Sequence, residues 1–310
     1  MAPTPIPRQG SFMSSNSGSK GYLGISLLVV ILIAAFSAQA QTPSPTPSPA
    51  PVASPSPTLE HEFFKNILRD QKAIWTSPAH LHAHDAKWLV PLGIATGSLI
   101  ATDRETGDAI ADSHDRLEPS RIISYAGAAY TLGAVAGTFY LVGRSKNNDR
   151  ARETGILSAE ALVNSFIVES ALKGITQRAR PTEGKDRSKF FVGGSSFPSG
   201  HSTQVWSVAT VIANEYHDHV GIQIAAYGIA GAVSVARFTG RYHYLSDVLV
   251  GSALGYGIGR YVYRTHHRKK VDSGGSEDEE ESQDRSRWPA IMPLYNRHAR
   301  NYGVALAWSF

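Results

Sequence analysis

The chain has 310 residues, of which 42% are hydrophobic and 18% are charged, so it has enough apolar residues for a packed core and is not a disordered protein. Its formal net charge of +4 suits anionic substrates or an anionic membrane surface, but no basic patch with interleaved aromatic residues indicates nucleic-acid binding. The absence of cysteine excludes disulfides, thiolate zinc sites and lipoprotein anchoring.

The first 40 residues are typical of an export signal. An apolar stretch at 21–36 is followed by Ala38 and Ala40, which fit an A-x-A cleavage site. We therefore expect residues 1–40 to be a signal peptide and the protein to be exported to the periplasm or cell envelope, with an uncleaved membrane anchor as the alternative. Residues 41–58 have proline at nearly every second position, which predicts an extended spacer.

Residues 59–266 predict one helical domain. The apolar blocks are rich in alanine and glycine, so helix backbones can approach closely, and alternation typical of strands is nearly absent. The expected fold class is all-α, a helical bundle. The blocks lie at 88–101, 122–143, 155–175, 203–216, 221–238 and 245–263.

The sequence leaves open whether these helices cross a membrane. A spanning helix needs about 20 mostly apolar residues, a length that 122–143 reaches and 245–263 nearly reaches. The block at 155–175 carries Glu160, Asn164 and Glu169, spaced as the polar stripe of an amphipathic helix. Basic residues follow two of the blocks and would lie on one, cytoplasmic side. We favour a periplasmic bundle near a membrane over an embedded one.

The C-terminal part has a different character. Residues 267–287 predict a charged linker. From Tyr302 to Phe310 large apolar residues alternate with small ones, which is the pattern of a strand. The aromatic terminus resembles the closing strand of an outer-membrane barrel, but one strand cannot form a barrel. We expect residues 288–310 to form a strand or short hairpin packed on the bundle.

A basic cluster, KGITQRARP, stands where an apolar helix should end. It contains Lys173, Arg178 and Arg180, and Pro181 disfavours helix at the residue before it. Lys173 and Arg180 are seven residues apart, so on a helix they would share a face and together hold one anion. Alone the cluster is weak evidence, because basic residues at helix C-termini usually just complement the helix dipole.

A second cluster, SSFPSGHSTQVWS at 195–207, follows Gly193 and Gly194 and opens a helix. Ser199 can cap that helix and donate to an anion, while Gly200 lets backbone N–H groups approach a ligand. His201 then stands where a group that titrates near pH 7 would meet a bound phosphate. The alternative is an ordinary capped helix.

A third cluster, ARFTGRYHYLSDVLVG at 236–251, pairs a histidine with an acid. Arg237 closes one helix, His243 lies near the start of the next, and Asp247 follows four residues later. A carboxylate at that position can accept the proton of one ring nitrogen and leave the other nitrogen nucleophilic. As an isolated pattern the pair is a common surface feature.

The order and spacing of the three clusters resemble the signature of the type 2 phosphatidic acid phosphatase superfamily, which also includes vanadium haloperoxidases. The match spans about 75 residues, from the Lys-x6-Arg-Pro pattern to the Arg-x5-His-x3-Asp pattern. One departure is Ala236, where the family often has serine.

The resemblance implies a phosphatase that acts on phosphate monoesters or lipid phosphates through a phosphohistidine, with no cofactor or metal. His243 would attack phosphorus, Asp247 would orient it, and His201 would protonate the leaving oxygen and then activate water. The phosphate would be held by five further residues, namely Lys173, Arg180, Ser199, Gly200 and Arg237.

Two other functions remain open. A vanadium-dependent haloperoxidase could use the same residues to hold vanadate, although such members of the family tend to be longer. A non-catalytic envelope protein that binds phosphate is the second alternative. Separately, HLHAHD at 80–85 offers three histidines and Asp85, but a polar helix entry is favoured over a metal site.

Overall fold

The computed structural model describes residues 59–110, 114–184, 187–267, 290–296 and 301–307. The expected signal peptide at 1–40, the spacer at 41–58 and, apart from His267, the linker at 267–287 lie outside these residues. The chain divides after His267 into two compact units, of which the first carries the three motif clusters.

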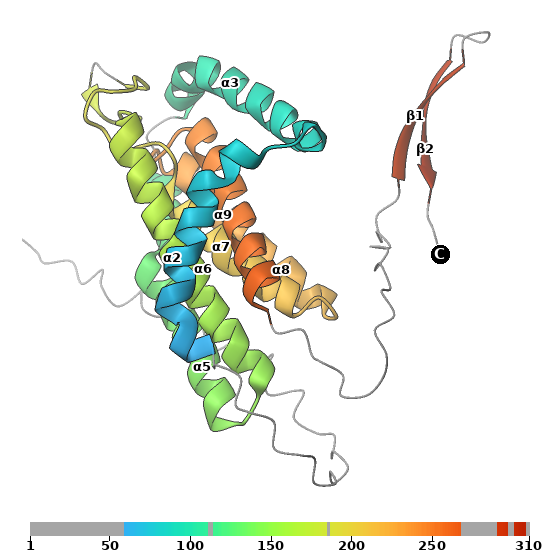
Figure 1. Cartoon of the computed structure of the whole chain (residues 1–310). Helices are drawn as coiled ribbons and strands as arrows, with labels where there is room; N and C mark the ends of the chain where they lie inside the picture. Colours follow the sequence, from blue (N-terminus) through green and yellow to red (C-terminus); the bar gives the residue numbers. More distant parts are fainter. Residues whose placement is uncertain (1–58, 111–113, 185–186, 268–289, 297–300, 308–310) are drawn as a thin grey trace, which may run out of the picture. The chain divides into compact units, whose positions relative to one another are not determined.

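In the first unit the described residues form helices, which confirms the expected all-α bundle (Figure 1). The block at 122–143 contains two helices rather than one. The break falls at Gly127, where a Cβ atom would lie only 2.5 Å from Cγ1 of Val233. The helices are α2 (Leu59–Thr76), α3 (Ala86–Ala109), α4 (His114–Ala126), α5 (Ala129–Ser145), α6 (Asp149–Thr176), α7 (Gly200–Glu215), α8 (Val220–Thr239) and α9 (Leu245–His266), with short 3-10 turns η1 (Ser77–His80) and η2 (Ala83–Asp85).

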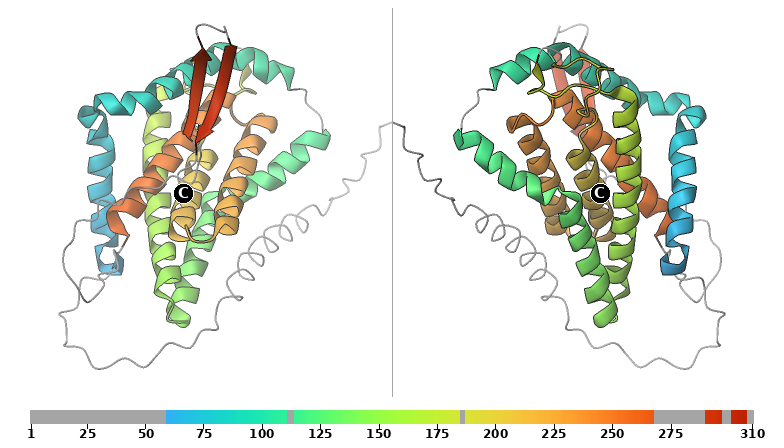
Figure 2. Two further views of the ribbon diagram at one scale, coloured as in Figure 1. Left: turned by 90° about the vertical axis from the view of Figure 1, so that its right-hand side faces the viewer. Right: turned by 90° about the vertical axis from the view of Figure 1, so that its left-hand side faces the viewer.

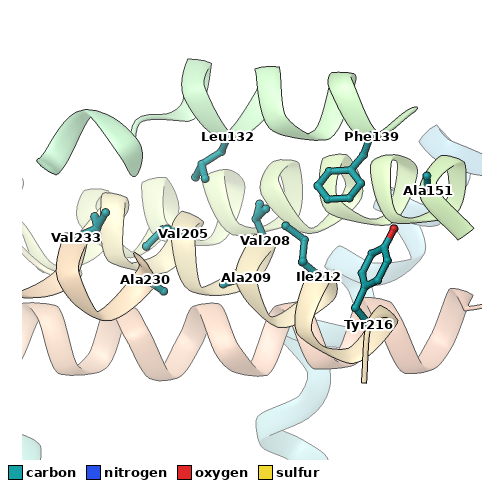
Figure 3. Close-up of a cluster of buried hydrophobic side chains, with 10 residues drawn as sticks. All are labelled: Leu132, Phe139, Ala151, Val205, Val208, Ala209, Ile212, Tyr216, Ala230 and Val233. Atoms are coloured by element: carbon teal, nitrogen blue, oxygen red, sulfur yellow. The ribbon is translucent and has the colours of Figure 1, made fainter. Parts of the chain in front are cut away.

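Helix α7 is the centre of the bundle. It packs against α6, α8 and α9, and it contributes to both hydrophobic clusters of the core. Figure 3 shows the larger cluster, in which Leu132 and Phe139 of α5 face Val208 and Ile212 of α7. The smaller cluster joins α7 to α6 and α9. Because α7 is covered on all sides, its first residues are held in a fixed position.

The contact between α7 and α9 depends on glycine. Gly251, Gly255 and Gly259 recur every four residues on the face of α9 that meets α7. A Cβ atom on them would lie 2.6, 2.2 and 2.3 Å from backbone oxygens of Ser199, Thr203 and Ser207, respectively. Rising numbers on α9 therefore match rising numbers on α7, so the two helices run parallel and begin at the same end of the bundle. We call these three residues the glycine seam.

The bundle has two chemically different ends. At the motif end, α6 and α8 end while α7 and α9 begin, and α3 lies across it (Figures 1 and 2). At the opposite, basic end, Nε of Arg150 in α6 donates to the carbonyl of Glu215 at the end of α7 (3.0 Å). His267, directly after α9, lies 3.1 Å from Glu153 there. The basic residues after α5 and at the end of α9 therefore share one end, as their order in the sequence suggested.

The polar stripe of α6 is buried rather than solvated, which corrects the expectation of an ordinary amphipathic surface. Glu160 and Asn164 are fully buried beneath α2. Asn66 donates to Glu160 (3.1 Å), and Asn164 donates to Asp70 (2.9 Å). Polar groups at these positions thus attach α2 to the bundle, because each buried donor and acceptor needs a partner.

Three segments are long and apolar enough to cross a membrane, judged by length and composition. They are Leu117–Ser145, Asp149–Thr176 and Val220–Thr239, so the segment at 155–175 qualifies and that at 245–263 does not. Large apolar side chains are exposed along all three, which water would disfavour and lipid would accommodate. These segments favour the embedded bundle over the peripheral one that we expected. The exposed side chains include Tyr130, Leu141, Phe166, Ile175, Val220, Ile224 and Val235.

The second unit contains an antiparallel pair of strands. β1 (Ala290–Asn296) pairs with β2 (Asn301–Ala307), with Ala290 opposite Ala307 and Asn296 opposite Asn301. This pairing is the expected hairpin, whereas its packing on the bundle stays a prediction. Trp308 and Phe310, which completed the alternating pattern, lie outside the described residues.

Adding a methyl group to the glycine seam should separate α7 from α9. Gly255→Ala is expected to lower the free energy of unfolding by about 1–3 kcal/mol, because its Cβ would overlap the Thr203 carbonyl. Gly257→Ala is the matched control on the same helix, since its Cβ meets nothing within 4 Å, and it should be neutral or stabilising by up to about 1 kcal/mol. Thermal unfolding measures both. Equal effects of the two substitutions would contradict the role of the seam.

Candidate active site

The three sequence clusters come together at the motif end of the bundle. Lys173 lies in the last turn of α6, Gly200 and His201 open α7, Arg237 lies in the last turn of α8, and Asp247 lies in the first turn of α9. The other three candidates, Arg180, Ser199 and His243, stand in the segments next to these helix ends. The site is therefore assembled from the ends of four helices.

Helix α6 ends earlier than the sequence suggested. Gln177 adopts a left-handed conformation (φ 45°) and caps the helix with an N–H bond to the carbonyl of Lys173. Arg180 is therefore not on the helix, and the expectation that Lys173 and Arg180 share a helical face is wrong. Pro181 therefore does not end α6, because the chain has already left the helix at Gln177. Arg180 instead approaches the site from the following loop, where its Nη2 donates to Ser195 Oγ (3.3 Å).

His243 is buried, with 2% of its surface exposed, and its ring is oriented by a backbone carbonyl. The Nδ1 atom lies 2.7 Å from the oxygen of Ser196 and 3.8 Å from Oδ2 of Asp247. Because a carbonyl oxygen only accepts, Nδ1 must carry the proton. The lone pair of the neutral ring then stands on Nε2. The nearest orienting group is thus Ser196, with the Asp247 carboxylate behind it.

Asp247 holds the segment that carries His243. Its carboxylate accepts from the hydroxyl of Ser196 (2.6 Å), the backbone N–H of Tyr244 (2.9 Å) and Nη1 of Arg178 (2.5 Å). Burial alone would raise the pKa of Asp247, but the nearby His243, the charge of Arg178 and the Ser196 hydrogen bond hold it below its ordinary value. The carboxylate is therefore ionised and fixes both Ser196 and the entry into α9.

Arg178 is fully buried, and no pattern in the sequence indicated a distinct role for it. Besides Asp247, its guanidinium donates through Nη2 to Asp103 of α3 (2.8 Å) and through Nη1 to Ser246 (2.7 Å). The rings of Phe190 and Tyr244 lie 4.7 and 4.5 Å from its Cζ atom. Arg178 is therefore a structural cation that holds two carboxylates in place.

Asp103 is a further residue that sequence reasoning missed. It is fully buried, and its carboxylate also accepts from the backbone N–H (3.3 Å) and the hydroxyl of Ser246. It lies 75 residues before Arg178 in an apolar helix without any recognisable motif. The only local signal was an acidic residue directly after an apolar block, which points to a buried partner but does not identify it.

Lys173 is paired with a second missed acid. Its ammonium forms an ion pair with Glu169, one turn earlier on α6, and Glu169 also accepts from Gln204 of α7 (3.3 Å). A Cβ atom on Gly200 would lie 2.8 Å from the Lys173 ammonium. Glycine at this position therefore lets Lys173 approach the start of α7.

The start of α7 offers hydrogen-bond donors to an anion. Ser199 is the N-cap residue, but its side chain forms no cap, because its hydroxyl oxygen accepts from Ser202 (3.1 Å). The N–H of Ser199 donates to the carbonyl of Asp247 (3.0 Å) and so joins the starts of α7 and α9. Two parallel helices thus direct their positive N-termini toward one place, which favours a bound anion.

Arg237 supplies another cation. It is 7% exposed, its Cζ atom stacks 4.1 Å from the ring of Tyr242, and its buried Nε has no hydrogen-bond partner among the described residues. The carbonyl of Arg237 accepts from the N–H of His243 (3.2 Å). An anionic ligand would satisfy the unbonded guanidinium N–H, because a buried donor without a partner is costly.

Both histidines are held neutral. Burial, followed by the charges of Arg237, Lys173 and Arg180, lowers the pKa of His201 to about 3. Burial, with Arg237 and Arg180 and against the opposing effect of Asp247, lowers the pKa of His243 to about 4. The arrangement therefore combines two neutral imidazoles with three cations, a constellation suited to an attack on a bound phosphate.

The histidine-rich turn lies apart from these residues in the sequence. His82, His84 and Asp85 have ligand atoms within 4.8 Å of one another, but the side chain of His84 is 71% exposed. Asp85 accepts from the backbone N–H of His82 (2.9 Å) in the turn η2, directly before α3. This is the polar helix entry that the sequence favoured.

Comparison with known proteins relates these residues to a family. Residues 154–270 match the family model described as the PAP2 superfamily, and this segment contains all three sequence clusters. A 70-residue part of the chain is 33% identical to a lipid A 1-phosphatase of Porphyromonas gingivalis. That match covers 22% of this chain and only 16% of the relative, so the chain aligns with less than a fifth of that protein.

Two solved structures are similar in part. The transmembrane PAP2-type phosphatidylglycerolphosphate phosphatase of Bacillus subtilis is 24% identical with a TM-score of 0.42, and the match covers 66% of this chain and 93% of that one. LpxE of Aquifex aeolicus is 17% identical with a TM-score of 0.38, covering 53% and 93% of the two chains.

Asp103 is not one of the residues proposed to contact the substrate, but removing its charge should still disable the active site. Asp103→Asn is expected to cost about 3–5 kcal/mol of stability, since it leaves the buried Arg178 with one carboxylate fewer. Asp108→Asn on the same helix breaks a half-exposed ion pair with Arg187 and should cost under about 1 kcal/mol. Denaturant unfolding and phosphatase assays measure both variants. Similar losses in the two would show that the buried network has no special role.

Proposed function

We propose that this protein is a lipid phosphate phosphatase that works through a phosphohistidine intermediate, because residues 154–270 match the PAP2 superfamily model. The observation that carries the proposal is the neutral, oriented imidazole of His243 in a setting of fixed cations. A phosphate group is the anion that three cations, two helix N-termini and a histidine nucleophile would serve together.

In the first step, Nε2 of His243 attacks phosphorus in line with the ester oxygen. The P–O bond breaks, the phosphoryl group is transferred to His243, and the proton of the substrate monoanion passes through His201 to the departing alkoxide. Nδ1 keeps its proton and stays hydrogen-bonded to the Ser196 carbonyl, while the nearby Asp247 carboxylate stabilises the positive charge that develops on the ring. The nucleophile therefore needs no proton transfer before attack.

In the second step, His201 accepts a proton from water as that water attacks the phosphohistidine. The P–N bond breaks, His201 passes its proton to the departing inorganic phosphate, and both histidines return to their neutral state. Throughout, Lys173, Arg180 and Arg237 hold the non-bridging oxygens, with the amide of Gly200 as a further donor. These groups are in position before the reaction, so stabilising the transition state costs little reorganisation. No step of the scheme uses a metal ion.

A lipid substrate is supported by an apolar cavity between α4, α5, α7 and α8. Its volume is about 810 Å³, in the range of small-molecule sites, and it is lined by residues such as Leu132, Val205 and Ile229. Val205 is one turn along α7 from His201. A relative that is 33% identical over 70 residues is named a lipid A 1-phosphatase, which is in line with a lipid substrate.

An outward-facing site is supported by the charge of the opposite end. Arg144, Lys146, Arg150 and Arg152 surround the turn between α5 and α6, and Arg264 lies in the last turn of α9. Positive residues are enriched on the cytoplasmic side of spanning helices. The motif end would then face the periplasm, in agreement with the export expected from the first 40 residues.

The roles of the two histidines predict different defects. With EDTA present, His243→Ala should lower kcat by about four to six orders of magnitude, because the nucleophile is lost. His201→Ala should lower kcat for a long-chain lipid phosphate by about 10²–10⁴. It should lower kcat for a nitrophenyl ester much less, because that leaving group needs no proton. Phosphate release measures both, with the exposed His217→Ala as the control.

Equal and mild effects of the two substitutions would refute these roles. A short soluble ester turned over faster than the long-chain lipid would refute the lipid preference. Bromide oxidation by the vanadate-loaded protein would indicate a haloperoxidase, and silence in both assays a protein that only binds phosphate.

The lowered pKa values predict an acidic optimum. His243 is neutral above about pH 4. His201, with a pKa of about 3, is also neutral, so its catalytic proton must arrive with the substrate monoanion. For a soluble alkyl phosphate, kcat/KM should therefore fall below about pH 4 and above the second phosphate pKa of about 6. An ester with a lower second phosphate pKa should shift the upper limb of the pH profile of kcat/KM to lower pH by the difference between the two pKa values. An upper limb that ignores the ester pKa would contradict this source of the proton.

A further inference from the structure

Three ionisable side chains meet at the basic end of the bundle, away from the motif end. Glu153 lies in the first two turns of α6, Glu215 is the last residue of α7, and His267 follows directly after α9. Their ligand atoms all lie within 4.8 Å of one another. Two helices and the residue after a third thus each contribute one side chain of a type that binds metal ions, and the three side chains meet at one point.

The distances within this cluster fit a shared cation. Nδ1 of His267 is 3.1 Å from Oε1 of Glu153 and 3.2 Å from Oε2 of Glu215. Four ligands placed tetrahedrally at about 2.0 Å from a zinc ion are about 3.3 Å apart. Despite these short distances, Nδ1 of His267 and Oε2 of Glu215 are buried atoms without a hydrogen-bond partner among the described residues. The atoms approach one another without the angles of a hydrogen bond, as ligands directed at a common centre do.

The surroundings leave the Glu215 carboxylate in need of a cation. Its side chain is only 3% exposed. The neighbouring Arg150 directs its guanidinium to the backbone carbonyl of Glu215 (3.0 Å) and to the carboxylate of Asp218 (3.0 Å). The ring of Tyr263 stacks on His267 at 4.6 Å and holds the imidazole in place. The side chain of His267 is 34% exposed, which leaves one side of the cluster open to a solvent ligand.

A second buried cluster nearby has a different geometry. His266 and Asp70 form a hydrogen bond of 2.8 Å, and Asn66 and Asn164 donate to the carboxylates of Glu160 and Asp70. That cluster is a hydrogen-bonded attachment of α2. The two adjacent histidines at the end of α9 therefore serve different purposes.

We propose that Glu153, Glu215 and His267 form a binding site for a divalent transition metal ion, with Zn²⁺ as the cation that fits best. One imidazole and two carboxylates are ligands that Zn²⁺ accepts, and the two negative charges balance the ion. The site joins α6, α7 and α9 at the end opposite the catalytic residues. Its role is structural, because an ion that binds the folded chain alone adds its binding free energy to stability.

The test uses the untagged full-length chain in detergent. After a chelator wash, addition of Zn²⁺ should restore one equivalent of bound metal, measured by elemental analysis after gel filtration, and should raise Tm by several degrees. His267→Ala and Glu215→Gln should each weaken zinc binding by at least tenfold and abolish the Tm shift. His217→Ala, an exposed histidine just after α7, is the matched control and should keep both.

The same titration in a His243→Ala chain separates this site from the proposed catalysis, because it reads metal content and Tm rather than turnover. If Glu215→Gln does not fold, the half-exposed His267→Ala decides the question. The proposal is overturned if the parent chain retains no zinc, if zinc binding persists in His267→Ala, or if His217→Ala loses it equally. In the first case the cluster is only a contact between one imidazole and two carboxylates.

Discussion

The close contact of α7 with α9 is the constraint on which the site depends. Side chains at Gly251, Gly255 and Gly259 would force the helices apart, and without them the backbones come into direct contact. Because the helices run parallel, their N-termini meet at one end, and the Ser199 N–H bonds to the Asp247 carbonyl (3.0 Å) across the junction. Two positive helix ends that would be far apart in an antiparallel pair thus act on one anion.

Buried ions give this junction its rigidity. Arg178 is surrounded by Asp103, Asp247 and Ser246, and two aromatic rings cover its faces. Such an ion pair adds little net stability compared with apolar packing, but breaking it is costly, because a charge would then be buried alone. The ion pair therefore serves mainly to hold residues in position. Through Asp247 it fixes Ser196, whose carbonyl in turn fixes the tautomer of His243.

The two ends of the bundle have opposite electrostatic character. At the motif end, cations outnumber acids around two neutral imidazoles. Glu169 partly neutralises one of these cations, Lys173. At the basic end, acids are buried among cations, and the cluster around Glu215 would be balanced by a bound metal. One end is thus arranged to receive a mobile anion, and the other to hold the helices together.

The sequence alone determined the helices, the three clusters and the types of residue that are proposed to bind a phosphate, because caps, prolines and apolar periodicity act over a few neighbouring residues. It also brought Lys173, His201 and His243 into one hypothesis through their spacing. Only the tertiary structure decided that Ser196 orients His243, that Arg180 stands beyond the helix, and that the stripe of Glu160 and Asn164 is buried. Each of these depends on contacts between distant segments, such as the 75 residues that separate Asp103 from Arg178, and no local pattern encodes which distant partner will arrive.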